Sequence, residues 1–218
     1  MHSVAKLQSG RHEIAMPAKA GEMLFLEGEP CEHVYELRSG IARGISISEE
    51  GDRQVTSFFF AGDQIGLPVS QAYRFTAEAV TDLLFVRHSL PRWHEALIRS
   101  CREEGRLLPS ICAEQDPVFR RGMILGRHGV LVRVCAFLVS IIDRLQTSPE
   151  GKLLLPLPQV DIAAYLATSP ESICRALRQL REQHIIAMLR RDQIEITDRR
   201  RLEALAGRSL RDTSEFNG

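Results

Sequence analysis

The segment Leu157 to Leu180 reads Leu-Pro-Gln-Val-Asp-Ile-Ala-Ala-Tyr-Leu-Ala-Thr-Ser-Pro-Glu-Ser-Ile-Cys-Arg-Ala-Leu-Arg-Gln-Leu and contains two short helical patterns. Gln159 to Leu166 places its apolar side chains on one face, and the break Ala-Thr-Ser follows. Ser169 suits the N-cap of a second helix, and Pro170 suits its first turn because that turn needs no N–H donor. The segment therefore predicts two helices joined by a tight turn.

The second predicted helix has two chemically different faces. At about 100° per residue, Ile173, Leu177 and Leu180 point one way. The opposite face carries one acid, one thiol and two arginines: Glu171, Cys174, Arg175 and Arg178. Two short helices with such an outward face are typical of a helix-turn-helix that binds the DNA major groove. An ordinary helical hairpin with a solvated charged face fits the same periodicity.

The residues after Leu180 favour the DNA-binding interpretation. Ile185 to Ile196 predicts two short strands around the polar turn Arg190 to Gln193. A helix-turn-helix followed by a hairpin with a basic tip is a winged helix. Lys152 to Arg211 holds eleven basic and seven acidic residues, although the whole chain balances 28 against 28. The positive excess therefore lies on the part predicted to meet phosphates.

Length and composition limit the class of protein. The 218 residues are enough for two modest domains. Met1 to Met16 is polar and lacks the apolar core of a signal peptide. The most apolar run, Val134 to Ile142, is about half the length of a bilayer span, so we expect no membrane association and a cytoplasmic protein. The sequence has no Gly-rich phosphate loop, no G-x-S-x-G and no H-E-x-x-H, so we expect no enzyme.

The cysteines are scattered along the chain: Cys31, Cys101, Cys112, Cys135 and Cys174. No pair has the C-x-x-C spacing of a zinc site, and no group has the clustered spacing of iron–sulfur ligands. We therefore predict free thiols and no metal site. Cys174 differs because the helix dipole and nearby arginines favour its thiolate, although Glu171 opposes it. Its oxidation or alkylation is a hypothetical redox switch of DNA binding, and a passive residue in a serine's place is the alternative.

The first half of the chain predicts an all-β domain. Glycines recur at turn positions: Gly21, Gly28, Gly40, Gly51 and Gly62. Runs of strand-forming residues lie between and after them: Met23 to Leu26, His33 to Leu37, Ile41 to Ile47, Val55 to Phe60, Phe75 to Ala79 and Asp82 to Val86. Strand-turn units spaced about 8–12 residues apart predict a sandwich or a barrel.

A helical pattern follows from Trp93 to Cys101, and then an apolar stripe alternates by three and four residues. The members of the stripe are Leu108, Ile111, Gln115, Val118, Gly122 and Leu125. This is the spacing of a coiled-coil seam, which needs a partner, so the stripe predicts a symmetric homodimer. Packing of the stripe on the chain's own β-domain is the alternative. Gly126 to Gly129 should break the helix, which resumes from Val130 to Leu145.

Short motifs in each part of the chain match one known family. The β-rich half contains Ala20-Gly21-Glu22, Phe60-Ala61-Gly62-Asp63 and Arg74-Phe75-Thr76-Ala77-Glu78-Ala79. The middle contains Gly126-Arg127 and Arg133-Val134-Cys135-Ala136-Phe137-Leu138. With Glu171 and Arg175 in the spacing E-x-x-x-R, nearly the whole chain resembles the FixK-like branch of the Crp/Fnr superfamily of bacterial transcription regulators.

The resemblance implies an α+β fold in three parts. Residues 1–106 would form a cyclic-nucleotide-binding-like β-roll, of the jelly-roll or double-stranded β-helix type. Residues 107–146 would form the dimerisation helix and a hinge, and residues 147–218 the winged helix-turn-helix.

The resemblance also implies that Glu171 and Arg175 bind a G·C pair in each half of a TTGA-type inverted repeat. An arginine fork matches guanine O6 and N7, and a carboxylate accepts from the cytosine amino group. Being four residues apart, the two side chains could also brace one another. Pro170 and Cys174 are expected beside them at the base edges. The expected phosphate contacts are Ser169, Arg178, Arg190 and Arg191.

The implied partners are palindromic promoter DNA and RNA polymerase, and the implied role is activation. Two residues depart from the family's pattern. Cys174 stands where Fnr-type members have the serine of E-x-x-S-R, which leaves the base beside the main contact undefined. His184 stands where members often have a glycine that closes the recognition helix, and histidine tolerates that backbone conformation better than most residues.

The same resemblance argues against a bound cofactor. Cyclic-nucleotide-binding members have a Gly-Glu pair and an Arg-Ser or Arg-Thr pair around the phosphate, whereas here Leu67 follows Gly66 and Phe75 follows Arg74. Iron–sulfur Fnr proteins use an N-terminal cysteine group, and this half holds only Cys31. An effector-gated sensor that binds haem or another small ligand is the alternative within the fold, and an adaptor that binds protein is the alternative outside it. Histidines available for haem are His2, His33 and His88.

Overall fold

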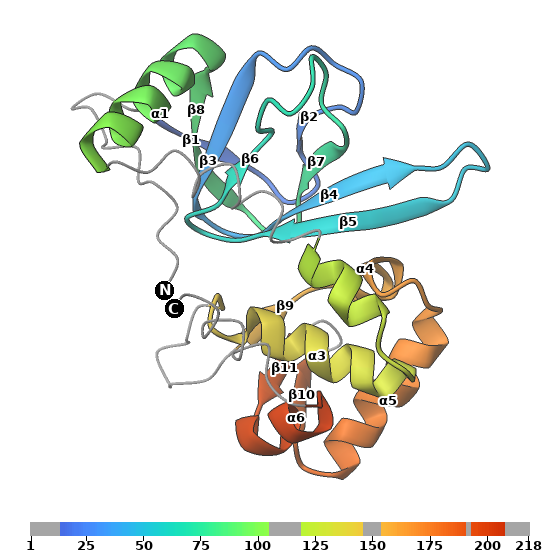
Figure 1. The fold of residues 1–218 in the computed structure, drawn as a ribbon. Coiled ribbons are helices and arrows are strands. Elements are labelled where there is room, and N and C mark those ends of the chain that lie inside the picture. Colours follow the sequence, from blue (N-terminus) through green and yellow to red (C-terminus); the bar gives the residue numbers. More distant parts are fainter. Residues whose placement is uncertain (1–13, 105–118, 146–153, 191–192, 208–218) are drawn as a thin grey trace. The chain divides into compact units, whose positions relative to one another are not determined.

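The computed structural model describes residues 14–104, 119–145, 154–190 and 193–207 (Figure 1). The chain divides into two units, Met1–Phe119 and Arg120–Gly218, and each has its own buried side chains. The first unit is rich in strands and the second in helices, so the predicted α+β class is confirmed. None of the helices in the described ranges is both long enough and apolar enough to span a membrane.

The first unit is built from two four-stranded antiparallel sheets (Figure 1). One has the order β1-β8-β3-β6, from strands Ala15–Ala18, Leu83–Ser89, His33–Ser39 and Gln64–Ile65. The other has the order β2-β7-β4-β5, from strands Met23–Phe25, Thr76–Ala79, Ala42–Ile47 and Arg53–Phe59. The predicted arrangement of short strands is thus confirmed. The sequence did not predict β1, which contains Pro17, or β6, which is two residues long.

Aromatic side chains from several strands and one loop fill the core of the first unit. Phe25 stacks on Tyr73 with ring centroids 3.7 Å apart, and its ring lies 5.4 Å from that of Tyr35. The rings of Phe59 and Phe75 are 5.6 Å apart. Most of these residues belong to one buried cluster, so the interior of the β-roll is occupied by the chain's own side chains.

Two glycines after neighbouring turns of the β-roll have different surroundings. Gly66 has a φ of +76°, and a Cβ built there would lie 2.8 Å from the ring of Tyr73 and 3.1 Å from that of Phe25. Gly62 has a φ of +92°, but a Cβ there would meet nothing within 4 Å. Both positions need the left-handed backbone that favours glycine, whereas only Gly66 also lies against buried rings.

After β8, the first unit continues into α1, Leu90–Glu104, which confirms the helix predicted from Trp93 to Cys101. Trp93 is buried, and its indole N–H donates to the Oε1 atom of Gln64 at 3.2 Å. This bond ties α1 to the neighbouring sheet. Because Trp93 is the single tryptophan in the sequence, its fluorescence reports on this unit.

The second unit is organised around α3, Val130–Ile142, which packs against α5 and α6. The break at Gly126 to Gly129 and the resumed helix are therefore confirmed. The other elements are β9 Leu154–Pro156, α4 Gln159–Tyr165, α5 Pro170–Glu182, β10 Ile186–Arg190, β11 Gln193–Ile196 and α6 Arg199–Leu205. The strands form one antiparallel sheet in the order β10-β11-β9.

The sequence predicted the two-stranded wing but not β9 or α6. The strand β9 is three residues long and ends in Pro156. The helix α6 begins at an N-cap, Asp198, whose Oδ1 atom accepts from the N–H of Arg201 at 3.0 Å. The strand β9 is too short to show a clear period, and α6 begins with three arginines and so has little apolar pattern. The predicted domain boundaries at residues 106 and 146 fall outside the described residues and stay predictions.

A pair of glycine substitutions separates ring packing from backbone strain in the β-roll. Gly66→Ala should lower the free energy of unfolding by about 3 kcal/mol, because the new methyl group meets buried rings in a strained backbone. Gly62→Ala has only the strain and should cost about 1–2 kcal/mol. Urea unfolding followed by the fluorescence of Trp93 measures both. Equal losses would contradict the tight packing at Gly66.

Candidate nucleic-acid interface

The turn between α4 and α5 is tight and uses an unusual backbone conformation. After α4, Ala167 has a φ of 48°, a region that residues with a Cβ rarely adopt. The N–H of Thr168 donates to the carbonyl of Ala163 at 3.1 Å. Ser169 then caps α5, and Pro170 opens it. The predicted two helices, break and cap are confirmed.

One face of α5 is buried and the other is exposed. The buried residues are Ile173, Ala176, Leu177 and Leu180, which pack toward α3 and α4. The predicted contact residues on α5 all have exposed side chains: Pro170, Glu171, Cys174, Arg175 and Arg178. Ser169, the N-cap residue, is exposed as well. The outward orientation expected from the period is therefore confirmed.

Hydrogen bonds at the N-terminus of α5 orient its first polar residues. The Oγ atom of Ser169 accepts from the N–H of Ser172 at 3.2 Å. A hydrogen bond from its own backbone N–H, the Ser169 hydroxyl and the charge of Arg175 lower the pKa of the Glu171 carboxyl. Glu171 is therefore ionised at neutral pH and can accept hydrogen bonds from a base or a solvent molecule.

Arg175 is braced by a serine rather than by the acid. Its Nη2 atom donates to the Oγ of Ser172 at 3.3 Å, and that oxygen lies 3.1 Å from the Oγ of Ser169. Across the described residues, no ion pair joins Arg175 to Glu171, so the direct brace suggested by their spacing is wrong. Both side chains instead meet hydroxyl groups of the first turn. Sequence reasoning missed Ser172, because a single half-buried serine between an exposed acid and the buried Ile173 gives no periodic signal.

The described cysteines lie in different surroundings. Cys31 is buried in the β-roll, and Cys135 is buried on α3, where burial raises the pKa of its thiol to about 11. Cys174 is exposed on the outward face of α5. The side chains of Cys101 and Cys112 lie outside the described residues. In the part of the chain that the structure describes, no three His, Cys, Asp or Glu side chains gather into a metal-binding group.

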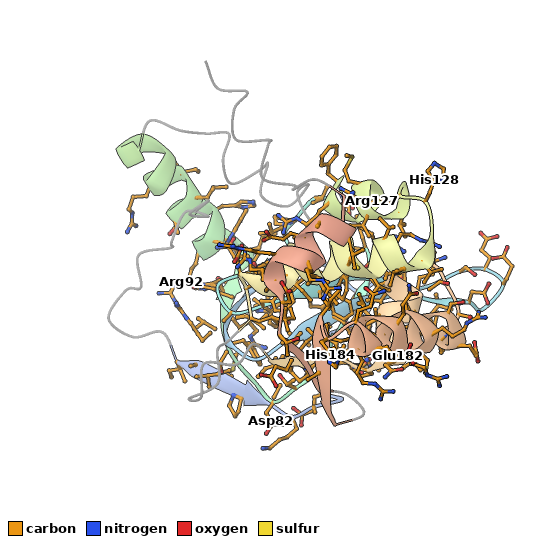
Figure 2. All side chains as sticks on the ribbon, turned by 90° about the horizontal axis from the view of Figure 1, so that it is seen from below. Asp82, Arg92, Arg127, His128, Glu182 and His184 are labelled. Carbon is orange, nitrogen blue, oxygen red and sulfur yellow. The ribbon has the colours of Figure 1, made fainter. Side chains whose placement is uncertain are left out.

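The backbone at the end of α5 agrees with the sequence prediction. His184 has a φ of 55°, so the left-handed conformation expected at this position is confirmed. Its carbonyl accepts from the hydroxyl of Thr197 at 2.8 Å, which fixes the chain between α5 and the wing. In Figure 2, Glu182 and His184 mark this end of the helix. The side chain of Arg190 and the whole of Arg191 lie outside the described residues, so their predicted phosphate contacts stay predictions.

Several arginines of this unit form hydrogen bonds or ion pairs with other parts of the protein. Arg199 bridges Asp143 at 2.7 Å and Glu203 at 2.8 Å, which ties α6 to the end of α3. Arg201 donates to the carbonyl of Gln183, at the C-cap of α5, at 3.0 Å. The exposed arginines of α5 are Arg175, Arg178 and Arg181. Arg181, on the last turn of the helix, was not among the predicted contacts.

The predicted dimer stripe lies partly outside the described residues. The members that lie outside the described residues are Leu108, Ile111, Gln115 and Val118. Residues 119–125 are helical, with Gly122 exposed and Leu125 half-buried. Ile124 is fully buried, and the exposed apolar side chains of this turn are Phe119 (64%) and Met123 (48%). At this end, the exposed apolar face therefore runs through Phe119, Gly122 and Met123.

Comparison with known proteins agrees with this geometry. Residues 132–205 match the Crp-like helix-turn-helix domain, and residues 16–100 match the cyclic nucleotide-binding domain. The transcriptional activatory protein AadR of Rhodopseudomonas palustris is 31% identical over 192 residues, which cover 85% of this chain and 78% of that protein. The chain belongs to the Crp/Fnr family of transcription regulators.

Other members of the Crp/Fnr family support the FixK-like resemblance. The nitrogen fixation regulation protein FixK of Rhizobium meliloti is 27% identical over 173 residues, covering 78% of this chain and 76% of that protein. The structure of FixK2 from Bradyrhizobium japonicum matches with a TM-score of 0.80 and 28% identity, and the match covers 91% of this chain and 99% of that one. These relatives are named as regulators, and no catalytic family is indicated.

Proposed function

We propose that the protein is a homodimeric transcription activator of the FixK type, which binds a TTGA-type inverted repeat in promoter DNA and needs neither an iron–sulfur cluster nor a cyclic nucleotide. The exposed face of α5, with Glu171 and Arg175 beside its capped N-terminus, is the observation that supports this most directly. Such a regulator would act with RNA polymerase in the cytoplasm, where promoter DNA lies.

The two side chains proposed to contact bases differ in chemistry. Arg175 would donate both arms of its guanidinium to guanine O6 and N7, while the ionised Glu171 would accept from the cytosine amino group. Pro170 and Cys174 would lie beside them against neighbouring base edges. Ser169, Arg178 and the wing arginines Arg190 and Arg191 would bind phosphates, which position the helix but do not select a sequence.

The interior of the β-roll supports a regulator that works without a small ligand. Tyr73 stacks on Phe25 beside Gly66, where cyclic-nucleotide-binding members place the Gly-Glu pair. Arg74, the candidate phosphate-binding arginine, is exposed. His33 and His88, the described candidates for haem, lie on β3 and β8, and the Nε2 atom of His88 is 3.4 Å from a carboxylate oxygen of the buried Glu36. His88 is thus placed beside an acid that can orient it.

Comparison of an alanine substitution at Arg175 with one at Arg178 distinguishes a base contact from a phosphate contact. Arg175→Ala should weaken binding to the inverted repeat by about 1–3 kcal/mol and lose discrimination at one base pair of each half-site. Arg178→Ala should weaken binding to all sequences alike and reduce the salt dependence by about one phosphate contact per subunit. Fluorescence anisotropy with base-substituted probes, at several salt concentrations and without added effector, measures both effects.

The control for these variants is Arg92→Ala, which removes an exposed arginine from α1 of the first unit (Figure 2). It should leave affinity and discrimination unchanged. Wild-type discrimination in Arg175→Ala would contradict base contact by this residue. A requirement for added cyclic nucleotide, or a Soret absorbance in the purified protein, would favour the effector-gated alternative.

Cys174 would serve as a redox-sensitive contact, because it is exposed on the predicted base-facing side of α5. Hydrogen peroxide converts a thiolate to a sulfenic acid with release of hydroxide, which adds a polar oxygen where a base edge must fit. Treatment should weaken DNA binding of the wild type by about tenfold or more, equivalent to at least about 1.4 kcal/mol, and dithiothreitol should reverse it. DNA binding by Cys174→Ser should be insensitive to peroxide. Equal peroxide sensitivity of the variant and the wild type would contradict a redox role for Cys174.

The exposed face of residues 119–125 supports dimerisation through this helix. Met123→Glu should place a charge in the contact and convert the dimer to a monomer, as measured by analytical ultracentrifugation. It should also weaken binding to the inverted repeat by about a hundredfold or more, because one half-site alone then contributes. Ile98→Glu, at a side chain of similar exposure on α1, is the control. A Met123→Glu dimer of wild-type affinity would contradict this interface.

A further inference from the structure

The C-terminal end of α4 is held by two arginines from the segment that precedes the winged helix. The Nε atom of Arg121 donates to the carbonyl of Tyr165 at 2.9 Å, and its guanidinium carbon lies 5.5 Å from the centroid of the Tyr165 ring. The Nη1 atom of Arg133, on α3, donates to the carbonyl of Leu166 at 3.0 Å. The last carbonyls of a helix lack partners within it and form the negative end of its dipole, so these cations are well placed.

The C-terminal end of α6 is held in the same way by Arg127. Its Nη1 atom donates to the carbonyl of Gly207 at 2.9 Å and also to that of Ala206. Gly207 has a φ of +65°, and a Cβ there would lie 3.1 Å from this Nη1 atom. Glycine therefore both ends the helix and leaves room for the guanidinium.

These three arginines, here called the hinge arginines, lie before, within and after the glycine-rich break. Arg121 lies on the helix of residues 119–125, Arg127 in the break next to His128 (Figure 2), and Arg133 in α3. A segment that contains Gly126 and Gly129 has many accessible backbone conformations. Bonds from both sides of the break to α4 and α6 limit those conformations.

The end of α4 has a direct consequence for the recognition helix. Only the turn through Ala167 separates Leu166 from the cap of α5. The ring of Tyr165 also packs against Phe137 of α3, with centroids 5.2 Å apart. Where α4 ends therefore decides where α5 begins relative to α3 and to residues 119–125.

We infer that Arg121, Arg127 and Arg133 are positioning residues that set the distance between the two recognition helices, and so select the spacer between half-sites. The inference rests on the proposed function, in which two copies meet along the exposed face of residues 119–125. Since the hinge arginines bind backbone carbonyls, their loss should leave the recognition of each half-site unchanged.

Replacing Arg121 and Arg133 together by glutamine in the full chain tests this inference. Affinity is measured on inverted-repeat probes whose spacer has the preferred length or is one base pair longer or shorter. The wild type should lose about tenfold or more on the altered spacers, because rigid two-fold helices fit grooves only at one separation. The double variant should bind the preferred probe about tenfold more weakly and discriminate between spacers less than about twofold.

Three comparisons make the result decisive. Arg92→Gln, on α1 of the first unit, removes one exposed arginine and should keep wild-type spacer discrimination. Amide hydrogen exchange of residues 120–130 in DNA-free protein should accelerate about tenfold in the double variant and not in the control. The double variant Arg121→Lys/Arg133→Lys keeps a charged donor at each carbonyl and should restore part of both properties, which guards against a glutamine double variant that folds poorly.

Wild-type discrimination between spacers in the double variant, or equal weakening on every probe, would overturn the inference. Unchanged hydrogen exchange would overturn it as well. A wild-type protein that binds no inverted repeat would instead refute the proposed function, and the exchange measurement would still decide whether the arginines restrain the hinge.

Discussion

Burial of one face of α5 is the constraint on which the candidate DNA-binding surface depends. Ile173 and Leu180 are fully buried and Leu177 nearly so. These contacts fix the rotation of the helix about its axis, which leaves Glu171 and Arg175 facing outward. Burial contributes about 1.5–3 kcal/mol for each large apolar side chain, whereas an exposed ion pair contributes less than about 1 kcal/mol. The apolar residues of α5 therefore decide which polar residues meet a partner.

The arginines of the second unit divide into two groups with different roles. Four donate to the carbonyls that end α4, α5 and α6, and Arg199 bridges two carboxylates. The basic excess after Lys152 includes Arg199, whose charge is paired with two carboxylates, whereas Arg201 donates only to a carbonyl and stays exposed. A count of charges thus overstates the field available to DNA. The exposed arginines of α5 present their positive charges on one helix, close to where phosphates would lie.

Local signals in the sequence predicted α5 and its surroundings well. The Ser169 cap, Pro170 and the apolar period fixed the helix, and His184 marked its end. The sequence did not predict the partners of the helix ends, because a local pattern shows which carbonyls lack partners but not which distant side chain supplies them. Arg127 and Ala206 are 79 residues apart, for example. The brace from Ser172 is local and escaped prediction for a different reason, since spacing alone favoured an acid as the partner of arginine.

The same packing argument bears on where a signal could act. A ligand entering the β-roll beside Gly66 would have to separate the stacked rings of Phe25 and Tyr73, and each large aromatic displaced from a core forfeits several kcal/mol of burial and contact. The thiol of Cys174 is already exposed, so its modification disturbs no buried contact. A chemical change there acts on the outward face of α5 without first overcoming the packing of either core. Control at this face therefore requires less free energy than control through the β-roll interior.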